Sequence, residues 1–282
     1  MNLLFGKTTQ TTTTETTTRN ADGINRVAFC MGLNNYPGTS NDLKGCVNDA
    51  KNWANILKNN YQFNNVLVAL DNEMTKKNVV SKINNLSKDL KLGDIFVITY
   101  SGHGTSVPDQ NGDEADGRDE AWCLYDGTFI DDDIRNIVAK LPNGVKLTII
   151  SDSCHSGTVT RAFMGTMSDS EVTPKYLPPT DDIDAVTINA VPIMKSIFYP
   201  EENMSEILIS GCLPTEYSYD ARINGSPTGA FSYHALKILK ENGKITYNDF
   251  YKKLRKELPS SRYPQTPCLE GSKANKNSIM FE

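Results

Sequence analysis

A cysteine and a histidine lie in two short polar segments of this sequence, each beside glycine. Cys154 is in DSCHSG at 152–157, and His103 is in YSGHGT at 100–105, 51 residues earlier. A thiolate is a strong nucleophile for acyl transfer, and an imidazole can take the proton of a thiol. The pair predicts nucleophilic catalysis with Cys154 as nucleophile and His103 as base. His155 is the alternative base, although adjacent residues of an extended segment point to opposite sides of the chain.

Five short apolar runs are the elements that must position these two residues. Each run is apolar without alternation, which is typical of strands buried on both faces of a parallel sheet. YSGHGT follows the third run and DSCHSG follows the fourth. Because the carboxyl ends of parallel strands meet at one edge of a sheet, we expect His103 and Cys154 to meet there. The runs are Val27–Gly32, Val66–Leu70, Ile95–Tyr100, Leu147–Ser151 and Ile207–Ser210.

Helical spacing of apolar residues fills the segments between and after these runs. Thr75 is expected to cap one of these helices at its N-terminus. Strands that alternate with helices predict an α/β fold. We expect a three-layer α/β/α sandwich with a mostly parallel sheet of about six strands. The helical segments are 42–59, 75–90, 131–140, 228–240 and 246–258.

The start of the chain and one internal stretch interrupt this pattern. Residues 8–18 read TTQTTTTETTT, which offers no apolar face, so residues 1–24 are interpreted as a flexible leader. The alternative is an inhibitory arm. Residues 25–282 are expected to form one domain. Within that domain, 158–204 is rich in proline and acidic residues and is interpreted as a long loop rather than an element.

Composition excludes several classes of function. The chain of 282 residues has a net charge of −5, which argues against general binding to nucleic acid or to membrane surfaces. It contains no apolar run long enough to span a membrane. The apolar patch near the start is too short for a secretory signal, so a cytoplasmic location is expected. Six cysteines without a CxxC pair fit neither a zinc site nor a dense disulfide framework.

Several motifs together resemble the metacaspases and their bacterial or type I-like relatives among the caspase-like cysteine peptidases. They are LKGCVNDA at 43–50, YSGHGT, NGDEADGRDEA at 111–121, DSCHSG, and SPTGAFSY at 226–233. The cysteine motif differs from the QAC[RQG]G of animal caspases. The resemblance implies a caspase-like sheet, with a large-subunit-like part at 25–157 and a small-subunit-like part at 205–282. It also implies a Cys154–His103 dyad that needs no organic cofactor.

The resemblance further assigns roles to residues around the dyad. The backbone N–H groups of Gly104 and Cys154 would hold the oxyanion. Asp49, Ser101 and Asp152 would line the S1 pocket, which receives the residue before the cleaved bond (P1). Two carboxylates in a concave site favour a cationic side chain and repel an anionic one. We therefore expect a peptidase that cleaves protein substrates after arginine or lysine.

A calcium site is the second implication of the resemblance, because many metacaspases are activated by calcium. The acidic segment 109–120 is not an EF-hand, since its sixth position is Glu114 rather than glycine. In the resemblance, Asp119, Asp131 and Asp132 would be ligands, but Arg161 stands where the family has a further aspartate. An arginine cannot ligate a cation and would disfavour one. Arg161 pairing with those aspartates in place of calcium is the alternative.

Self-processing and rival functions complete the expectations. An enzyme specific for arginine and lysine could cut itself in the 158–204 loop, at Arg161, Lys175 or Lys195. Two rival functions are a latent caspase-fold binding module and a caspase-like peptidase with aspartate or asparagine at P1. A metal hydrolase built on the acidic segment would lack a cluster of histidine ligands. A monomer is expected, as in metacaspases generally.

Overall fold

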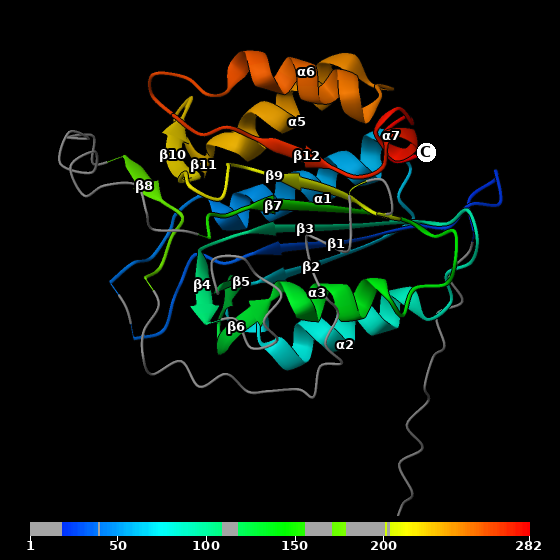
Figure 1. Cartoon of the computed structure of the whole chain (residues 1–282), viewed down its shortest axis with the longest axis horizontal. Coiled ribbons are helices and arrows are strands. Elements are labelled where there is room, and N and C mark those ends of the chain that lie inside the picture. The colour runs from blue at the N-terminus through cyan, green and yellow to red at the C-terminus, as the bar shows by residue number, and fades with distance from the viewer. Residues whose placement is uncertain (1–18, 39, 109–117, 156–170, 179–200, 202–203) are drawn as a thin grey trace, which may run out of the picture.

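A six-stranded sheet forms the centre of the molecule, with strand order β12-β9-β7-β3-β1-β2 (Figure 1). The computed structural model describes residues 19–38, 40–108, 118–155, 171–178, 201 and 204–282. Five strands run parallel, and β12 runs antiparallel to β9. The strands are β1 (Arg26–Gly32), β2 (Asn65–Leu70), β3 (Ile95–Ser101), β7 (Lys146–Asp152), β9 (Ile207–Ser210) and β12 (Cys268–Glu270).

The five predicted apolar runs are the five parallel strands. Every residue of β1 and β3 is buried, and so is every residue of β7 after Lys146. Continuous apolar sequence is required at these positions because helices cover both faces of the sheet. The predicted mostly parallel six-stranded sheet is confirmed. Its sixth strand, β12, spans three residues that are only partly buried, and so shows no continuous apolar run.

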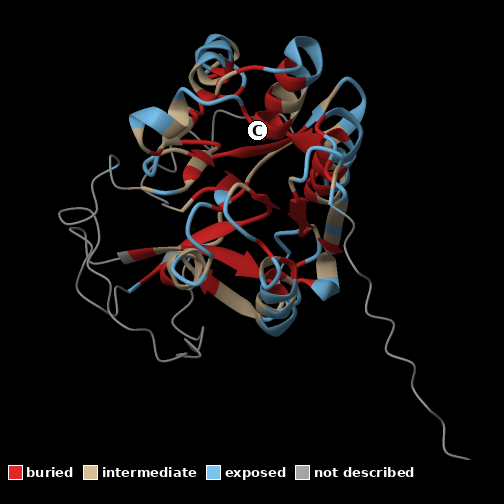
Figure 2. Ribbon diagram, turned by 90° about the vertical axis from the view of Figure 1, so that its right-hand side faces the viewer, coloured by how far each residue is buried: buried red, intermediate tan, exposed pale blue. Residues whose placement is uncertain are grey.

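Helices form the outer two layers of the sandwich. Helices α1 (Cys46–Asn60), α5 (Ala230–Asn242) and α6 (Tyr247–Glu257) cover one face, and α2 (Lys76–Ser87) and α3 (Asp131–Val138) cover the other (Figure 1). Each layer has its own hydrophobic core against the sheet, the first including Trp53 and Phe231 and the second Phe29 and Phe96. Figure 2 shows the buried strands between helices whose outer faces are exposed. Thr75 caps α2 as expected, accepting from Asn78 N at 3.3 Å.

Two small sheets at the carboxyl edge of the central sheet have no clear signal in the sequence. One consists of β4 (Gly104–Pro108), β5 (Arg118–Leu124) and β6 (Gly127–Ile130), and the other of β11 (Ser226–Gly229), β10 (Tyr219–Ile223) and β8 (Val172–Pro174). Strand β8 corrects the interpretation of 158–204 as a loop without elements. It forms because its backbone pairs with β10, antiparallel, over 172–174, and pairing between distant segments leaves no local pattern.

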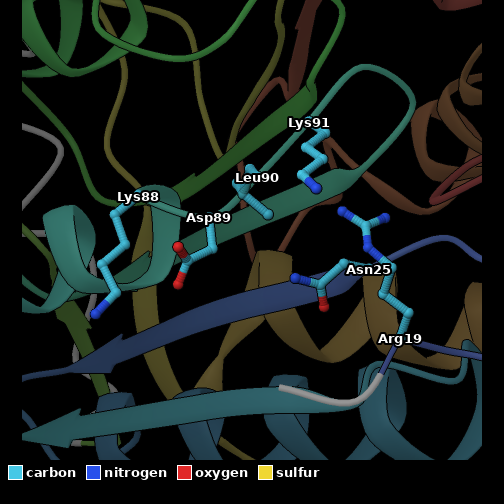
Figure 3. Close-up of a pocket in the computed structure, with 6 residues that line it drawn as sticks. All are labelled: Arg19, Asn25, Lys88, Asp89, Leu90 and Lys91. Atoms are coloured by element: carbon cyan, nitrogen blue, oxygen red, sulfur yellow. The ribbon is translucent and has the colours of Figure 1, made fainter. Parts of the chain in front are cut away.

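The opposite, amino edge of the central sheet contains a cavity of about 310 Å³ (Figure 3). Its lining comes from the segments that precede β1 and β3 and includes Arg19 and Asn25. Arg19 belongs to the predicted leader, of which the structure describes residues 19–24, while residues 1–18 lie outside the described part. Among the described residues, no helix is both long and apolar enough to cross a membrane.

Candidate active site

Two neighbouring strands bring the predicted dyad to the carboxyl edge of the sheet. Strands β3 and β7 pair in parallel with Ser101 opposite Asp152. His103 lies two residues beyond Ser101, and Cys154 two residues beyond Asp152, so parallel register places both just past the sheet. Both side chains are buried, as are Ser101 and Asp152.

The contacts of the His103 ring determine which nitrogen can act as a base. Nε2 lies 2.6 Å from the carbonyl oxygen of Asn41. Because a carbonyl only accepts hydrogen bonds, Nε2 carries the proton and Nδ1 has the free lone pair. Nδ1 is buried and has no hydrogen-bond partner among the described residues. Burial, assisted by the positive charge of Lys175, lowers the pKa of His103 to about 4. The imidazole is therefore neutral at physiological pH.

The thiol of Cys154 is held as a neutral group. Its Sγ lies 3.8 Å from the carbonyl oxygen of Ser218. Burial raises the pKa of Cys154 well above its ordinary value, and the positive charge of Lys175 opposes this only in part. A thiol in this state needs a base before it can attack, since the thiolate is the nucleophile.

His155, the alternative base, is engaged elsewhere. Its Nδ1 lies 3.2 Å from the carbonyl oxygen of Ala121. Its Nε2 lies 3.3 Å from Oγ of Ser153, which in turn lies 2.8 Å from Oγ of Ser151. These contacts tie the loop that carries Cys154 to strands β5 and β7.

The backbone of Lys175, directly after β8, lies across the end of β7. Its carbonyl oxygen accepts hydrogen bonds from the backbone N–H of Gly104 at 3.0 Å and of Cys154 at 3.2 Å. These are the two N–H groups that were expected to bind an oxyanion. A glycine is required at 104, because a Cβ there would overlap the carbonyl of Cys154. The N–H of Lys175 donates to the carbonyl of Ser218 at 2.8 Å.

The Lys175 side chain extends into a pocket lined by the three residues expected at S1. Its Nζ lies 3.0 Å from Asp152 Oδ2, 3.4 Å from Asp49 Oδ2 and 2.9 Å from Ser101 Oγ. The Lys175 side chain is 0% exposed. Its predicted role as a cleavage site assumed an exposed loop, and that assumption is wrong. The lysine is buried because two buried carboxylates and a hydroxyl satisfy its three donors.

Electrostatics in this pocket favour a bound cation. Burial raises the pKa of Asp49, and the positive charge of Lys175 acts in the opposite direction. Although burial opposes it, the negative charge of Asp152 raises the pKa of Lys175 well above its ordinary value. Two carboxylates buried together without a cation would repel each other. The pocket is thus complementary to a single positive charge.

Residues of the SPTGAFSY motif donate hydrogen bonds to the carboxylates of Asp49 and Asp152. The sequence did not reveal these contacts. Asp49 Oδ1 accepts from Thr228 Oγ1 at 2.6 Å and from the N–H of Gly229 at 3.0 Å. Asp152 Oδ2 accepts from both Oγ and N–H of Ser232. A Cβ at Gly229 would overlap the carboxylate of Asp152 and the ammonium of Lys175. The motif was visible in the sequence, but nothing local linked it to the pocket.

A third carboxylate, Asp220, supports the start of α1. Its Oδ2 accepts from the N–H of Lys44 at 2.6 Å and of Gly45 at 3.1 Å. Burial raises the pKa of Asp220 to about 6, with the positive charge of Lys175 acting against the rise. The turn it holds leads into the helix that carries Asp49.

The predicted calcium ligands are only partly described. Asp119 on β5 and Asp132 on α3 are buried, and Asp132 is paired with Arg135 at 3.5 Å. The side chain of Asp131, residues 109–117 and Arg161 lie outside the described part. Within the described residues, no group of three or more histidine, cysteine or acidic side chains could hold a metal ion. The calcium site and its alternative, replacement of the ion by Arg161, both stay predictions. Lys195 also lies outside the described residues.

Comparison with known proteins decides the family. The model of the caspase domain matches residues 25–279. The chain belongs to the caspase domain family. The same span contains both segments of the dyad and all five residues that bind the Lys175 carbonyl or contact its ammonium.

The relatives of this caspase domain confirm its resemblance to metacaspases. It is 30% identical to Metacaspase-1 of Coccidioides immitis, over 91% of this chain and 63% of that protein. It is also 30% identical to Metacaspase-1 of Saccharomyces cerevisiae, over 88% of this chain and 66% of that protein. The chain thus spans a little under two thirds of the length of these two relatives.

A solved structure shares the architecture of this caspase domain. The crystal structure of a Geobacter sulfurreducens protein matches with a TM-score of 0.72 at 29% sequence identity. The match covers 91% of this chain and 98% of that chain. The likeness therefore extends over most of the chain rather than over a single motif.

Proposed function

We propose that the chain is a cysteine endopeptidase that cleaves after lysine or arginine, with Cys154 and His103 as its dyad. We further propose that its first substrate is its own Lys175–Tyr176 bond. The observation that supports both is the position of Lys175. Its carbonyl receives two N–H donors, one of them from the nucleophile itself, while its ammonium lies between Asp49 and Asp152. This is the arrangement that a substrate with lysine at P1 requires.

Acylation follows from these contacts. The thiol of Cys154 gives its proton to Nδ1 of His103 as Sγ attacks the carbonyl carbon of Lys175. The charge that develops on the carbonyl oxygen is stabilised by the N–H groups of Gly104 and Cys154, and each such donor is worth about 100-fold or more in rate. The intermediate then expels the amine of Tyr176, which takes the proton from His103. A thioester joins Cys154 to Lys175.

Deacylation reuses the same base. A water molecule gives a proton to Nδ1 of His103 and attacks the thioester carbonyl, which is still held by the same two N–H groups. The thioester breaks, the Cys154 thiolate takes the proton from His103, and the new carboxylic acid at Lys175 releases its proton to solvent to become a carboxylate. Other protein substrates can bind once residues 171–175 leave the pocket. The uncut chain is therefore latent, because its own segment fills the site.

Specificity for a cationic P1 residue rests on charge. An arginine or lysine would replace the ammonium of Lys175 between Asp49 and Asp152. An aspartate there would add a third buried negative charge, which is strongly unfavourable. The pocket therefore supports arginine or lysine over the alternative of aspartate or asparagine.

Self-cleavage provides the first test. Purified wild-type protein should convert to fragments 1–175 and 176–282, identified by mass and by an N-terminus at Tyr176. Cys154→Ala should stay intact, Lys175→Arg should still be cut, and Lys175→Met should not be cut at this bond. Lys195→Met, at another candidate site, is the matched control and should still yield the Tyr176 N-terminus. Fragments from Cys154→Ala would point to a contaminating protease.

Cleavage of added peptides separates the proposal from its rivals. Self-processed enzyme should turn over fluorogenic peptides with arginine or lysine at P1 and not those with aspartate or asparagine. Gly229→Ala, which places a methyl group against the pocket carboxylate, should reduce this turnover by about 100-fold. Preference for aspartate would overturn the pocket assignment. An intact wild-type chain without turnover of any peptide would favour the latent binding module.

A further inference from the structure

The residue that follows Lys175 has a contact of its own in the site. The ring of Tyr176 lies against the ring of Tyr217, with centroids 5.8 Å apart and planes tilted by 48°. Tyr217 is 7% exposed and belongs to the same core cluster as Cys154, against which Tyr176 packs. In the proposed self-cleavage, Tyr176 is P1′, the first residue on the leaving side of the bond.

The backbone fixes where the leaving side of the substrate runs. Tyr176 pairs with Gly104 in a parallel bridge. The N–H of Leu177 then donates to the carbonyl oxygen of Gly104 at 3.0 Å. Gly104 thus binds the Lys175 carbonyl through its N–H and the following residues through its carbonyl. A substrate held this way has one position for its P1′ side chain, and that position faces Tyr217.

Tyr217 is buried and adjoins a residue that binds the substrate backbone. It directly precedes Ser218, whose carbonyl accepts from the Lys175 N–H and lies near the Cys154 thiol. Burial raises the pKa of Tyr217, so its hydroxyl is uncharged at physiological pH. A buried aromatic ring favours an aromatic partner through ring–ring contact in addition to burial.

We propose that Tyr217 determines specificity for the residue after the cleaved bond and favours an aromatic side chain there. This inference rests on the proposed endopeptidase function. The contact exists before the thioester forms and is lost when the amine departs. The preference should therefore appear in kcat/KM, which reports steps up to the first irreversible one, and not in the rate of deacylation.

A peptide series that varies only P1′ tests the inference. Self-processed enzyme is given internally quenched peptides Val-Thr-Pro-Lys-X-Leu, with X as tyrosine, phenylalanine, alanine or glutamate. Wild type should show kcat/KM about fivefold higher for tyrosine or phenylalanine than for alanine. Tyr217→Phe should keep this ratio, and Tyr217→Leu should reduce it to below about twofold. Because both kcat/KM values of the ratio come from the same enzyme variant, a general loss of activity lowers them equally and leaves the ratio unchanged.

Controls keep the outcomes distinct. Tyr251→Leu, on α6, removes a tyrosine outside the site and should leave the ratio at the wild-type value. In the uncut chain, Tyr176→Ala should slow self-cleavage about fivefold, whereas Tyr176→Phe should not. Cleavage after lysine with equal kcat/KM for tyrosine and alanine would overturn this inference and leave the endopeptidase proposal intact. Failure to cleave any of the four peptides would overturn both.

Discussion

One lysine side chain accounts for much of the chemistry at residue scale. Lys175 neutralises two carboxylates that would otherwise be buried together without a cation, and removing one partner of such a group typically costs about 3–5 kcal/mol. The same residue presents its carbonyl to Gly104 and Cys154. Stability of the uncut chain and reactivity of its own bond therefore depend on the same contacts. Asp220, which supports the start of α1, should make the free energy of unfolding depend on pH.

Asp220 should make the protein less stable as pH rises from 4 to 7. Its pKa is about 6 in the folded protein, above the ordinary value of 3.8. The folded state thus holds this proton more tightly than the unfolded chain. The resulting stabilisation is complete below pH 4 and is lost as pH rises through 6. The loss is up to about 3 kcal/mol. Asp220→Asn keeps an acceptor for the N–H groups of Lys44 and Gly45 and should remove this dependence.

Urea unfolding at pH 4, 5, 6 and 7 measures the effect. Both proteins carry Cys154→Ala so that neither is cut. The free energy of unfolding of Asp220→Asn minus that of its parent should become more positive with increasing pH. Taking the difference removes contributions from Asp49 and other groups common to both proteins. A difference that stays constant from pH 4 to 7 would contradict the assignment.

At the scale of elements, the site depends on five elements that meet at the carboxyl edge of the central sheet. Strands β3 and β7 supply Ser101 and Asp152 by their register. The first turn of α1 supplies Asp49. Strand β11 supplies Gly229, and β8 delivers Lys175 through its pairing with β10. Helix α3, on the other face of the sheet, begins with the aspartates that the metacaspase resemblance associates with calcium.

We expect chelation of calcium to leave self-cleavage and the melting temperature unchanged. Asp132 already has a cationic partner in Arg135, and Arg161 takes the place of an expected aspartate. The melting temperature of Cys154→Ala protein and the self-cleavage rate of wild type are measured with millimolar calcium and with chelator. A ligand present at 100 times its Kd would stabilise by about 2.7 kcal/mol, a shift of several degrees. A shift of that size would show that calcium binds.

At the scale of the whole molecule, the two edges of the sheet have different roles. The carboxyl edge contains the candidate site. At the amino edge, the segment before β1 forms hydrogen bonds with the residue that precedes β3. Arg19 forms two hydrogen bonds with the buried carboxylate of Asp94, at 2.7 and 2.8 Å. Asp94 also accepts from the N–H of Asn25 and of Lys91. Residues 19–24 therefore contact the domain. The interpretation of 1–24 as a flexible leader did not include these contacts.

Removing residues 1–24 should cost more stability than removing residues 1–18. The shorter truncation keeps Arg19, whereas the longer one leaves Asp94 buried without its cation. The longer truncation should have the lower free energy of unfolding, because it loses two hydrogen bonds to a charged group. Urea unfolding of both truncations in the Cys154→Ala protein measures it. In an Asp94→Asn background the difference should shrink, and an unchanged difference there would assign it to other contacts.

Elements with local sequence signals could be predicted from the amino-acid sequence. Buried parallel strands need continuous apolar runs, and covering helices need apolar residues at helical spacing, so both were predictable. The positions of Cys154 and His103 after two such strands followed from the same reasoning. The residues that surround Cys154 and His103 became known only from the tertiary structure. Gly229 contacts Asp49 across 180 residues of chain, and Lys175 reaches Ser101 across 74. Contacts over such separations leave no periodic trace, because they depend on how distant segments fold against one another.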